Sequence, residues 1–155
     1  TSAPTLCCQA SHVDDGDMTT RWSTNGSGNN SDYIYLDLGA KYDICKIAIT
    51  WENAYGKDFD IQISNDGTTW TTIDPVTGNT SKYTEFDGSV TAEYVRMQGI
   101  TPATGFGYSI YEFQVFGQPA SACAAPAELT STNVTQNTAA LNWDPVSGAT
   151  QYLIQ

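Results

Sequence analysis

The residues best able to bind a ligand gather between Trp51 and the turn at 65–67. Trp51 and Glu52 close an apolar segment, and the short loop after them contains Tyr55. A carboxylate accepts hydrogen bonds from hydroxyl or ammonium groups, while an aromatic ring covers the apolar face of a sugar. Because such side chains sit on a loop between two strand-like segments, they predict a site for a polyol or sugar.

A second group of polar residues lies near the start of the chain, where Asp14, Asp15 and Asp17 surround Gly16 and Thr20 follows. Calcium takes roughly six to eight oxygen ligands, so this loop is a candidate metal site. The positions of Gly and Glu exclude an EF-hand. From spacing alone, an acidic surface turn is the commoner outcome, and both interpretations stay open at this point.

The segments that must position these residues have the period of β-strands. Ile34, Leu36 and Leu38 share one face, while Tyr33 and Tyr35 point the opposite way. The same alternation recurs at 44–52, 59–64, 94–97 and 111–116. Turn sequences separate these runs, and no helical period is found from 1 to 117. Many short strands at this spacing predict an all-β fold, a β-sandwich.

Composition and charge exclude several classes of partner. The 155 residues are 40% hydrophobic, as in a folded globular protein, and six Lys and Arg stand against 17 Asp and Glu, a net charge of -11. Such a surface repels nucleic acid and anionic membranes, and no apolar run is long enough for membrane insertion. A cationic partner, a neutral polymer or a divalent metal remains compatible with it.

The four cysteines, Cys7, Cys8, Cys45 and Cys123, favour an oxidising, extracellular setting. Adjacent cysteines rarely bond to each other, so we expect one of the first pair to reach Cys45 or Cys123. Four cysteines allow three connectivities, and the sequence does not choose among them.

Three motifs in order, at 15–22, 51–67 and 105–117, resemble the discoidin family, also called coagulation factor five/eight type C. The likeness covers about residues 6 to 117 and is nearest to the bacterial carbohydrate-binding branch, family 32 of the carbohydrate-binding modules. The resemblance implies a discoidin-like jelly-roll β-sandwich over 1–117, with binding loops gathered at one end.

The resemblance also implies a structural calcium. Many family members hold this ion with the acidic loop and a Glu near the end of the last strand. Carried over to this chain, the ligand set is side-chain oxygens of Asp15 and Thr20, backbone carbonyls of His12 and Asp17, and the carboxylate of Glu112.

For the sugar, the resemblance implies a pocket formed by Arg21, Glu52 and Tyr108, as in relatives that bind chitosan or β-glucan ends. Tyr55, Phe106 and Tyr108 lie on loops, which makes them the candidates for stacking on a sugar ring. Trp51 shares a face with apolar residues, so we expect it in the core. An acidic pocket residue suits a glucosamine ammonium group, while neutral glucans and galactans remain open.

The composition of the chain changes after Gly117. Residues 118–127 are small and contain proline, which is typical of a linker. Residues 128–155 resemble the beginning of a fibronectin type III domain, with Leu129, Leu141, Trp143 and Tyr152 matching its first strands. A fragment of that size cannot bury a core alone, so we expect the parent protein to have further domains.

These observations predict a non-catalytic carbohydrate-binding module of a secreted, multidomain bacterial enzyme that degrades a polysaccharide of the β-glucan, chitosan or galactan class. The alternative is an adhesive or structural module of a bacterial cell-surface protein. Catalysis by this chain is not expected, because it has a single His and no nucleophile-base constellation.

Overall fold

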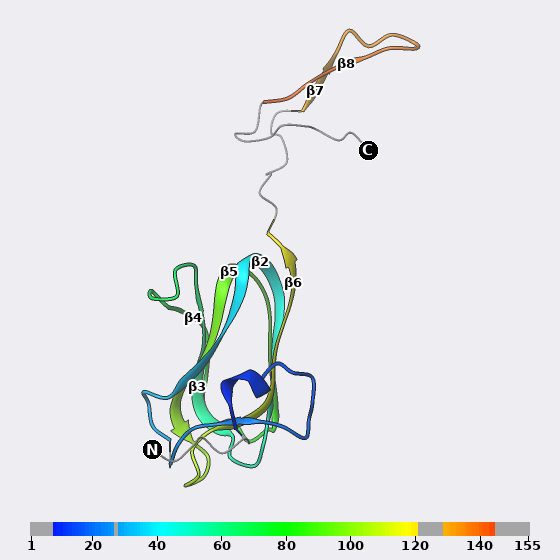
Figure 1. The fold of residues 1–155 in the computed structure, drawn as a ribbon. Coiled ribbons are helices and arrows are strands. Elements are labelled where there is room, and N and C mark those ends of the chain that lie inside the picture. The colour runs from blue at the N-terminus through cyan, green and yellow to red at the C-terminus, as the bar shows by residue number, and fades with distance from the viewer. Residues whose placement is uncertain (1–7, 27, 121–128, 145–155) are drawn as a thin grey trace. The chain divides into compact units, whose positions relative to one another are not determined.

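The computed structural model describes residues 8–26, 28–120 and 129–144. The chain divides into two compact units, Thr1–Ala120 and Ser121–Gln155, each described by itself. In its described part the first unit holds η1 (Ala10–His12), β1 (Trp22–Ser23), β2 (Tyr33–Trp51), β3 (Gly56–Ser64), β4 (Thr71–Val76), β5 (Tyr83–Pro102) and β6 (Ser109–Pro119), as Figure 1 shows.

Strands β2 and β5 are long enough to belong to both layers of the fold. The strands pair antiparallel in the order β1-β6-β2-β5-β3-β4. The start of β2 pairs with the end of β5, from Tyr33–Gln98 to Asp37–Tyr94. After a register shift before Tyr42, β2 pairs with the start of β5 and with β6. Because such irregularities bend a strand, the sheet closes into two layers, which confirms the predicted all-β sandwich.

The predicted lack of α-helices is also confirmed for the described residues, where η1 is the one helical element. No helix in this part of the chain is long and apolar enough to cross a membrane. The two layers of the sandwich therefore face each other directly across the core.

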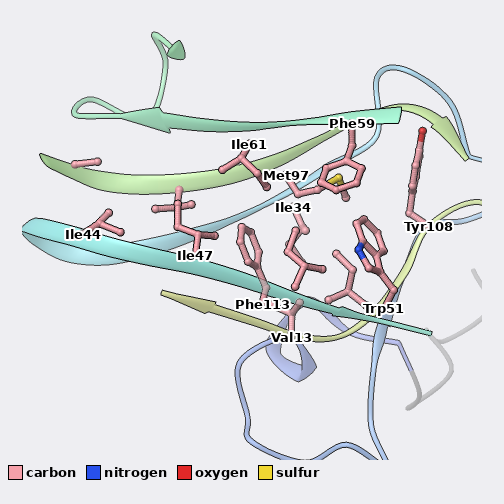
Figure 2. Close-up of a cluster of buried hydrophobic side chains, with 14 residues drawn as sticks. Val13, Ile34, Ile44, Ile47, Trp51, Phe59, Ile61, Met97, Tyr108 and Phe113 are labelled. Carbon is pink, nitrogen blue, oxygen red and sulfur yellow. The ribbon is translucent and has the colours of Figure 1, made fainter. Parts of the chain in front are cut away.

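The core forms because alternate strand positions are apolar. Ile34 and Phe59 come from one layer, Ile47 and Phe113 from the other, and all four are buried. Figure 2 shows these side chains pointing toward one another between the layers. Trp51 is 1% exposed and its ring meets Phe59 edge-on at 5.0 Å between centroids, which confirms its predicted core role.

The second unit contributes a small hairpin, β7 (Thr130–Thr132) paired with β8 (Ala140–Asn142). Leu129 and Leu141 in this segment are exposed, as expected for a fragment without a core. No finding supports a fibronectin type III domain, and Tyr152 lies outside the described residues. The predicted linker begins too early, because Gln118 and Pro119 pair with β2 as part of β6.

Two of the four cysteines, Cys8 and Cys45, lie in the described residues. Cys45 is a free, exposed thiol whose Sγ lies 3.4 Å from the carbonyl oxygen of Phe116. The described residues therefore show no disulfide, and the expected pairing of Cys45 stays a prediction. The register of β2 shifts between Ile44 and Lys46, and this irregularity leaves Cys45 exposed while Ile44 and Ile47 are buried. Cys7 and Cys123 lie outside the described residues.

Candidate functional site

A pocket of about 500 Å³ lies where four segments of the first unit meet. Pairing of Trp22 with Ile110 and of Ser23 with Ser109 joins β1 to the start of β6, which brings two of these segments together. The pocket is lined by Arg21, Ser23, Glu52, Asn53, Ala54, Thr104, Phe106 and Ser109. It thus contains Arg21, Glu52 and Phe106, three of the five residues predicted for sugar binding.

An ion pair forms the polar wall of the pocket. Nη1 of Arg21 lies 3.6 Å from Oε1 of Glu52, and their side chains are 40% and 14% exposed. The carboxylate is held by two further donors, the Asn53 side-chain amide at 2.9 Å and the Ala54 backbone N–H at 3.1 Å. A fixed, half-buried carboxylate beside a guanidinium offers an acceptor and a donor to one hydroxyl-bearing ligand.

The backbone around Glu52 is tied to β6. The N–H of Glu52 donates to the carbonyl of Ser109, and the N–H of Ser109 donates to the carbonyl of Ala54. These paired bonds fix the loop against the strand start, so Glu52 keeps its position before a ligand arrives.

Phe106 is the exposed aromatic residue of the pocket. Its side chain is 81% exposed at the tip of the 103–107 loop. The loop is anchored where the Ala103 N–H donates to the carbonyl of Tyr55. A ring presented in this way is available to stack on a sugar face.

Tyr55, which was predicted to stack on a sugar, does not line this pocket. Its side chain is half-buried and packs against the core cluster. Its contribution to the site in this structure is the backbone carbonyl that holds the 103–107 loop.

Tyr108 corrects a prediction, because its ring is completely buried and cannot stack on a ligand. Gly99 makes room for it, since a Cβ at that position would lie 2.5 Å from the Tyr108 ring. Burial raises the pKa of the Tyr108 phenol to about 12, and its hydroxyl has no hydrogen-bond partner among the described residues. Figure 2 shows the ring standing beside Trp51 within the core.

The backbone of Tyr108 nevertheless organises the site. Its carbonyl accepts a bond from the Thr24 N–H at 2.9 Å, and its N–H donates to Oγ1 of Thr24 at 3.0 Å. Gly107 lies between Phe106 and Tyr108 with φ of 79°, a conformation that glycine adopts readily. The chain therefore reverses direction there, so one ring points outward and the other inward.

Sequence reasoning missed Ser23, Asn53, Ala54, Thr104 and Ser109 as lining residues. Each lies within a few positions of a predicted site residue, so closeness in sequence to those residues was the one indication that it could line the pocket. The strand alternation that places core residues does not extend into loops, which is why polar neighbours could not be singled out.

The acidic loop brings the predicted metal oxygens together. Oγ1 of Thr20 donates to Oδ2 of Asp15 at 2.7 Å and lies 3.0 Å from the carbonyl oxygen of Asp17. The Asp17 carboxylate is occupied within its own turn, where it accepts bonds from the backbone and hydroxyl of Thr19. Those bonds lower the pKa of Asp17.

Glu112 supplies the buried side of this loop. It is 4% exposed, and its Oε1 is buried without a hydrogen-bond partner in the described residues. Burial raises the pKa of its carboxyl, and the charges of Asp15 and Asp14 raise it further, while bonds from the Gly16 and Asp17 backbone lower it. An unsatisfied carboxylate oxygen facing two acids is the setting that a bound cation would relieve.

The oxygens of the acidic loop are of the kind that a hard cation takes as ligands, but the described residues contain no cluster of three His, Cys, Asp or Glu side chains that could hold a metal ion of any kind. The oxygens near Asp15 include a hydroxyl and a carbonyl, which calcium accepts as ligands. His12 is half-buried, and its Nδ1 has no partner in the described part of the chain.

Comparison with known proteins agrees with this geometry. Residues 4–113 match the F5/8 type C domain, which is more than half of the chain. The chain belongs to the F5/8 type C domain family. No curated protein matches the chain.

Solved structures of the same family include two modules from one Paenibacillus sp. IK-5 enzyme, a chitosanase/glucanase. Chitosan-binding module 1 is 35% identical with a TM-score of 0.66, over 73% of this chain and 88% of that one. Chitosan-binding module 2, solved in complex with chitotriose, is 33% identical with a TM-score of 0.68, over 73% and 89%.

A more distant likeness is CpGH89CBM32-5 from Clostridium perfringens, solved in complex with GalNAc-beta-1,3-galactose. It is 23% identical with a TM-score of 0.64, over 71% of this chain and 84% of that one. At this identity the likeness supports the fold alone.

Proposed function

We propose that this chain is a non-catalytic carbohydrate-binding module that holds a secreted, multidomain enzyme close to its polysaccharide. The observation that carries the proposal is the 500 Å³ pocket in which the Arg21–Glu52 pair faces the exposed ring of Phe106. Relatives above 30% identity are chitosan-binding modules of a chitosanase/glucanase, which supports the same role here. Tethering raises the effective concentration of a catalytic domain near the polymer.

The chemistry of the pocket suits the end of a chitosan, β-glucan or galactan chain. The Glu52 carboxylate accepts two bonds from its own loop. A carboxylate has about four lone-pair sites, so acceptor capacity remains for a ligand hydroxyl or ammonium group. Arg21 supplies donors, and Phe106 covers one face of the sugar. A site with one ring and a few charged bonds should bind in roughly the micromolar to millimolar range.

We also propose a structural calcium ion in the acidic loop. Side-chain oxygens of Asp15, Thr20 and Glu112 would hold it together with the backbone carbonyl of Asp17, and His12 is expected to add its own carbonyl. The buried, unpartnered Oε1 of Glu112 supports this assignment. The ion would neutralise the carboxylates and stabilise the loop that leads to Arg21.

The proposal is tested by titrating a glucosamine trimer, laminarin, agarose and galactose-ended oligosaccharides against wild type and two variants. Glu52→Ala should weaken binding by about 10- to 100-fold, the effect of losing a charged hydrogen bond. Phe106→Ala should weaken it by about fivefold, from loss of stacking worth about 1 kcal/mol. Glu85→Ala, which removes an exposed carboxylate near the start of β5 that pairs with Lys46 and does not line the pocket, is the control and should bind as wild type.

Melting temperatures of all variants show whether the fold is retained. Binding that is indifferent to both pocket substitutions would refute the pocket assignment. Binding to none of the sugars would favour the alternative, an adhesive module of a bacterial cell-surface protein.

A further inference from the structure

The outer surface of the β3–β5–β2 layer carries an unusual number of aromatic rings. Tyr33 and Tyr35 alternate with the buried Ile34, so both point away from the core, and they are 49% and 50% exposed. Adjacent ring centroids are separated by 6.5 Å for Tyr33–Tyr35, 6.2 Å for Tyr35–Trp70 and 6.4 Å for Tyr35–Tyr94. We call this surface the aromatic face, formed by Tyr33, Tyr35, Trp70, Tyr94 and Arg96.

Arg96 is the cation of this face, and its guanidinium contacts aromatic rings and a Gln side chain within the protein. Its guanidinium carbon lies 4.1 Å from the centroid of the Trp70 ring and 5.2 Å from that of Tyr33. Its Nε donates to Oε1 of Gln62 at 2.9 Å, and Nη2 bonds to the same oxygen. Stacked on two rings and hydrogen-bonded to a neutral amide, this Arg orders the rings and keeps its positive charge.

Carboxylates border the same face. Asp37 is exposed and pairs across the strands with Tyr94, whose pKa it raises together with Glu93. Asp60 lies on β3 beside Gln62 and Thr72, to which its carboxylate is bonded. Three acids against one Arg leave this face and its border with a net negative charge, in a chain whose net charge is -11.

We propose that the aromatic face is a second binding surface, which packs against a polysaccharide chain carrying ammonium groups. This inference rests on the proposed function, because the ligand is again a polysaccharide. The hydroxyls of Tyr33 and Tyr35 make no hydrogen bond within the described part of the chain, so they can bond to sugar hydroxyls. The pocket would hold a chain end, and the face would hold internal residues of a polymer.

Two properties select this ligand over others. Rings and carboxylates together attract an ammonium group through cation–π and ionic contacts, whereas nucleic acid and anionic polymers are repelled. The rings are tilted by 31° to 60° to one another, so the surface is ridged. A ridged surface suits a single flexible chain better than the flat face of a crystalline polymer.

The experiment uses a variant that keeps the preference for strand, Tyr33→Thr/Tyr35→Thr. Its matched control is Tyr83→Thr, because Tyr83 is also 49% exposed on a strand but lies outside the face. Both are compared with wild type for binding of long chitosan, long laminarin and a glucosamine trimer, with melting temperature as the test of folding. Glu52→Ala is carried in parallel.

The double variant should bind long chitosan about tenfold more weakly or worse, because one of two linked contacts is lost. Its affinity for the trimer should be unchanged, as should laminarin binding, and Tyr83→Thr should behave as wild type. Wild-type affinity of the double variant for long chitosan would overturn this inference while leaving the pocket intact. An equal loss for laminarin would overturn the preference for ammonium groups. Trimer binding that survives Glu52→Ala would instead refute the proposed function.

Discussion

The pocket and the aromatic face present their side chains by opposite means. The pocket draws Arg21, Glu52 and Phe106 from separate loops, and hydrogen bonds between backbones hold them in place. The aromatic face needs no such support, since Tyr33 and Tyr35 are placed by the two-residue period of β2 alone. A loop-built site is therefore sensitive to distant core changes, and a strand-built surface is not.

The largest expected difference between the pocket and the aromatic face is in the free energy of unfolding lost when a tyrosine of each region is replaced by alanine. Tyr108→Ala removes a buried ring beneath the pocket loops and should lower the free energy of unfolding by about 3–5 kcal/mol. Tyr35→Ala removes an exposed ring from the aromatic face and should lower it by about 1 kcal/mol or less. Urea unfolding of both variants measures this, and equal losses would contradict the comparison. Tyr108→Phe, which deletes only the unpartnered hydroxyl, should be as stable as wild type.

A second difference concerns calcium, which should stabilise the loop leading to the pocket. At a hundredfold excess over its dissociation constant, a ligand adds about 2.7 kcal/mol. A chelator or Asp15→Ala should remove that increment, which would be seen as a lower melting temperature. Asp14→Ala should still gain melting temperature when calcium is added. A melting temperature indifferent to the chelator would show that the loop binds no metal.

Glu112 gives the same loop a dependence on pH. Without metal, its raised pKa means that the folded state binds the proton more tightly than the unfolded chain. Its contribution to stability is then present at low pH and is lost as the pH rises through the folded pKa. In chelator, Glu112→Gln should therefore become more stable relative to wild type as the pH rises above 4.5, the ordinary pKa of a Glu carboxyl. With calcium added, the order should reverse.

The smallest effect is expected from truncation. Removing residues 121–155 should leave the unfolding transition of the sandwich unchanged, because β6 ends at Pro119 and the unit boundary follows Ala120. Both binding surfaces should survive. Circular dichroism and sugar titration of residues 1–120 check this, and loss of the fold would mean that the boundary is misplaced.

Much of the fold could be predicted from the sequence wherever apolar and polar residues alternate along the chain. The sandwich, the core position of Trp51 and the outward direction of Tyr33 and Tyr35 all follow from the period of two. The burial of Tyr108 does not follow from this period. It depends on Gly107, which turns the chain, and on Gly99 of another strand, which leaves room for the ring. Such complementarity between residues far apart in sequence cannot be read from the alternation of residues within one segment. Likewise, outward alternation of Glu112 did not reveal that the 10–17 segment covers it.

The pairing of β1 with β6 also sets when the pocket can form. Trp22 must find Ile110, and β2 must find residues as distant as Pro119. Contacts so far apart in sequence make folding slow, because long loops must close before any pairing is gained. During synthesis, the residues at 104–109 leave the ribosome some 80 residues after Arg21, an interval of about 4–16 s at typical elongation rates. The pocket is thus among the last parts of the first unit to assemble.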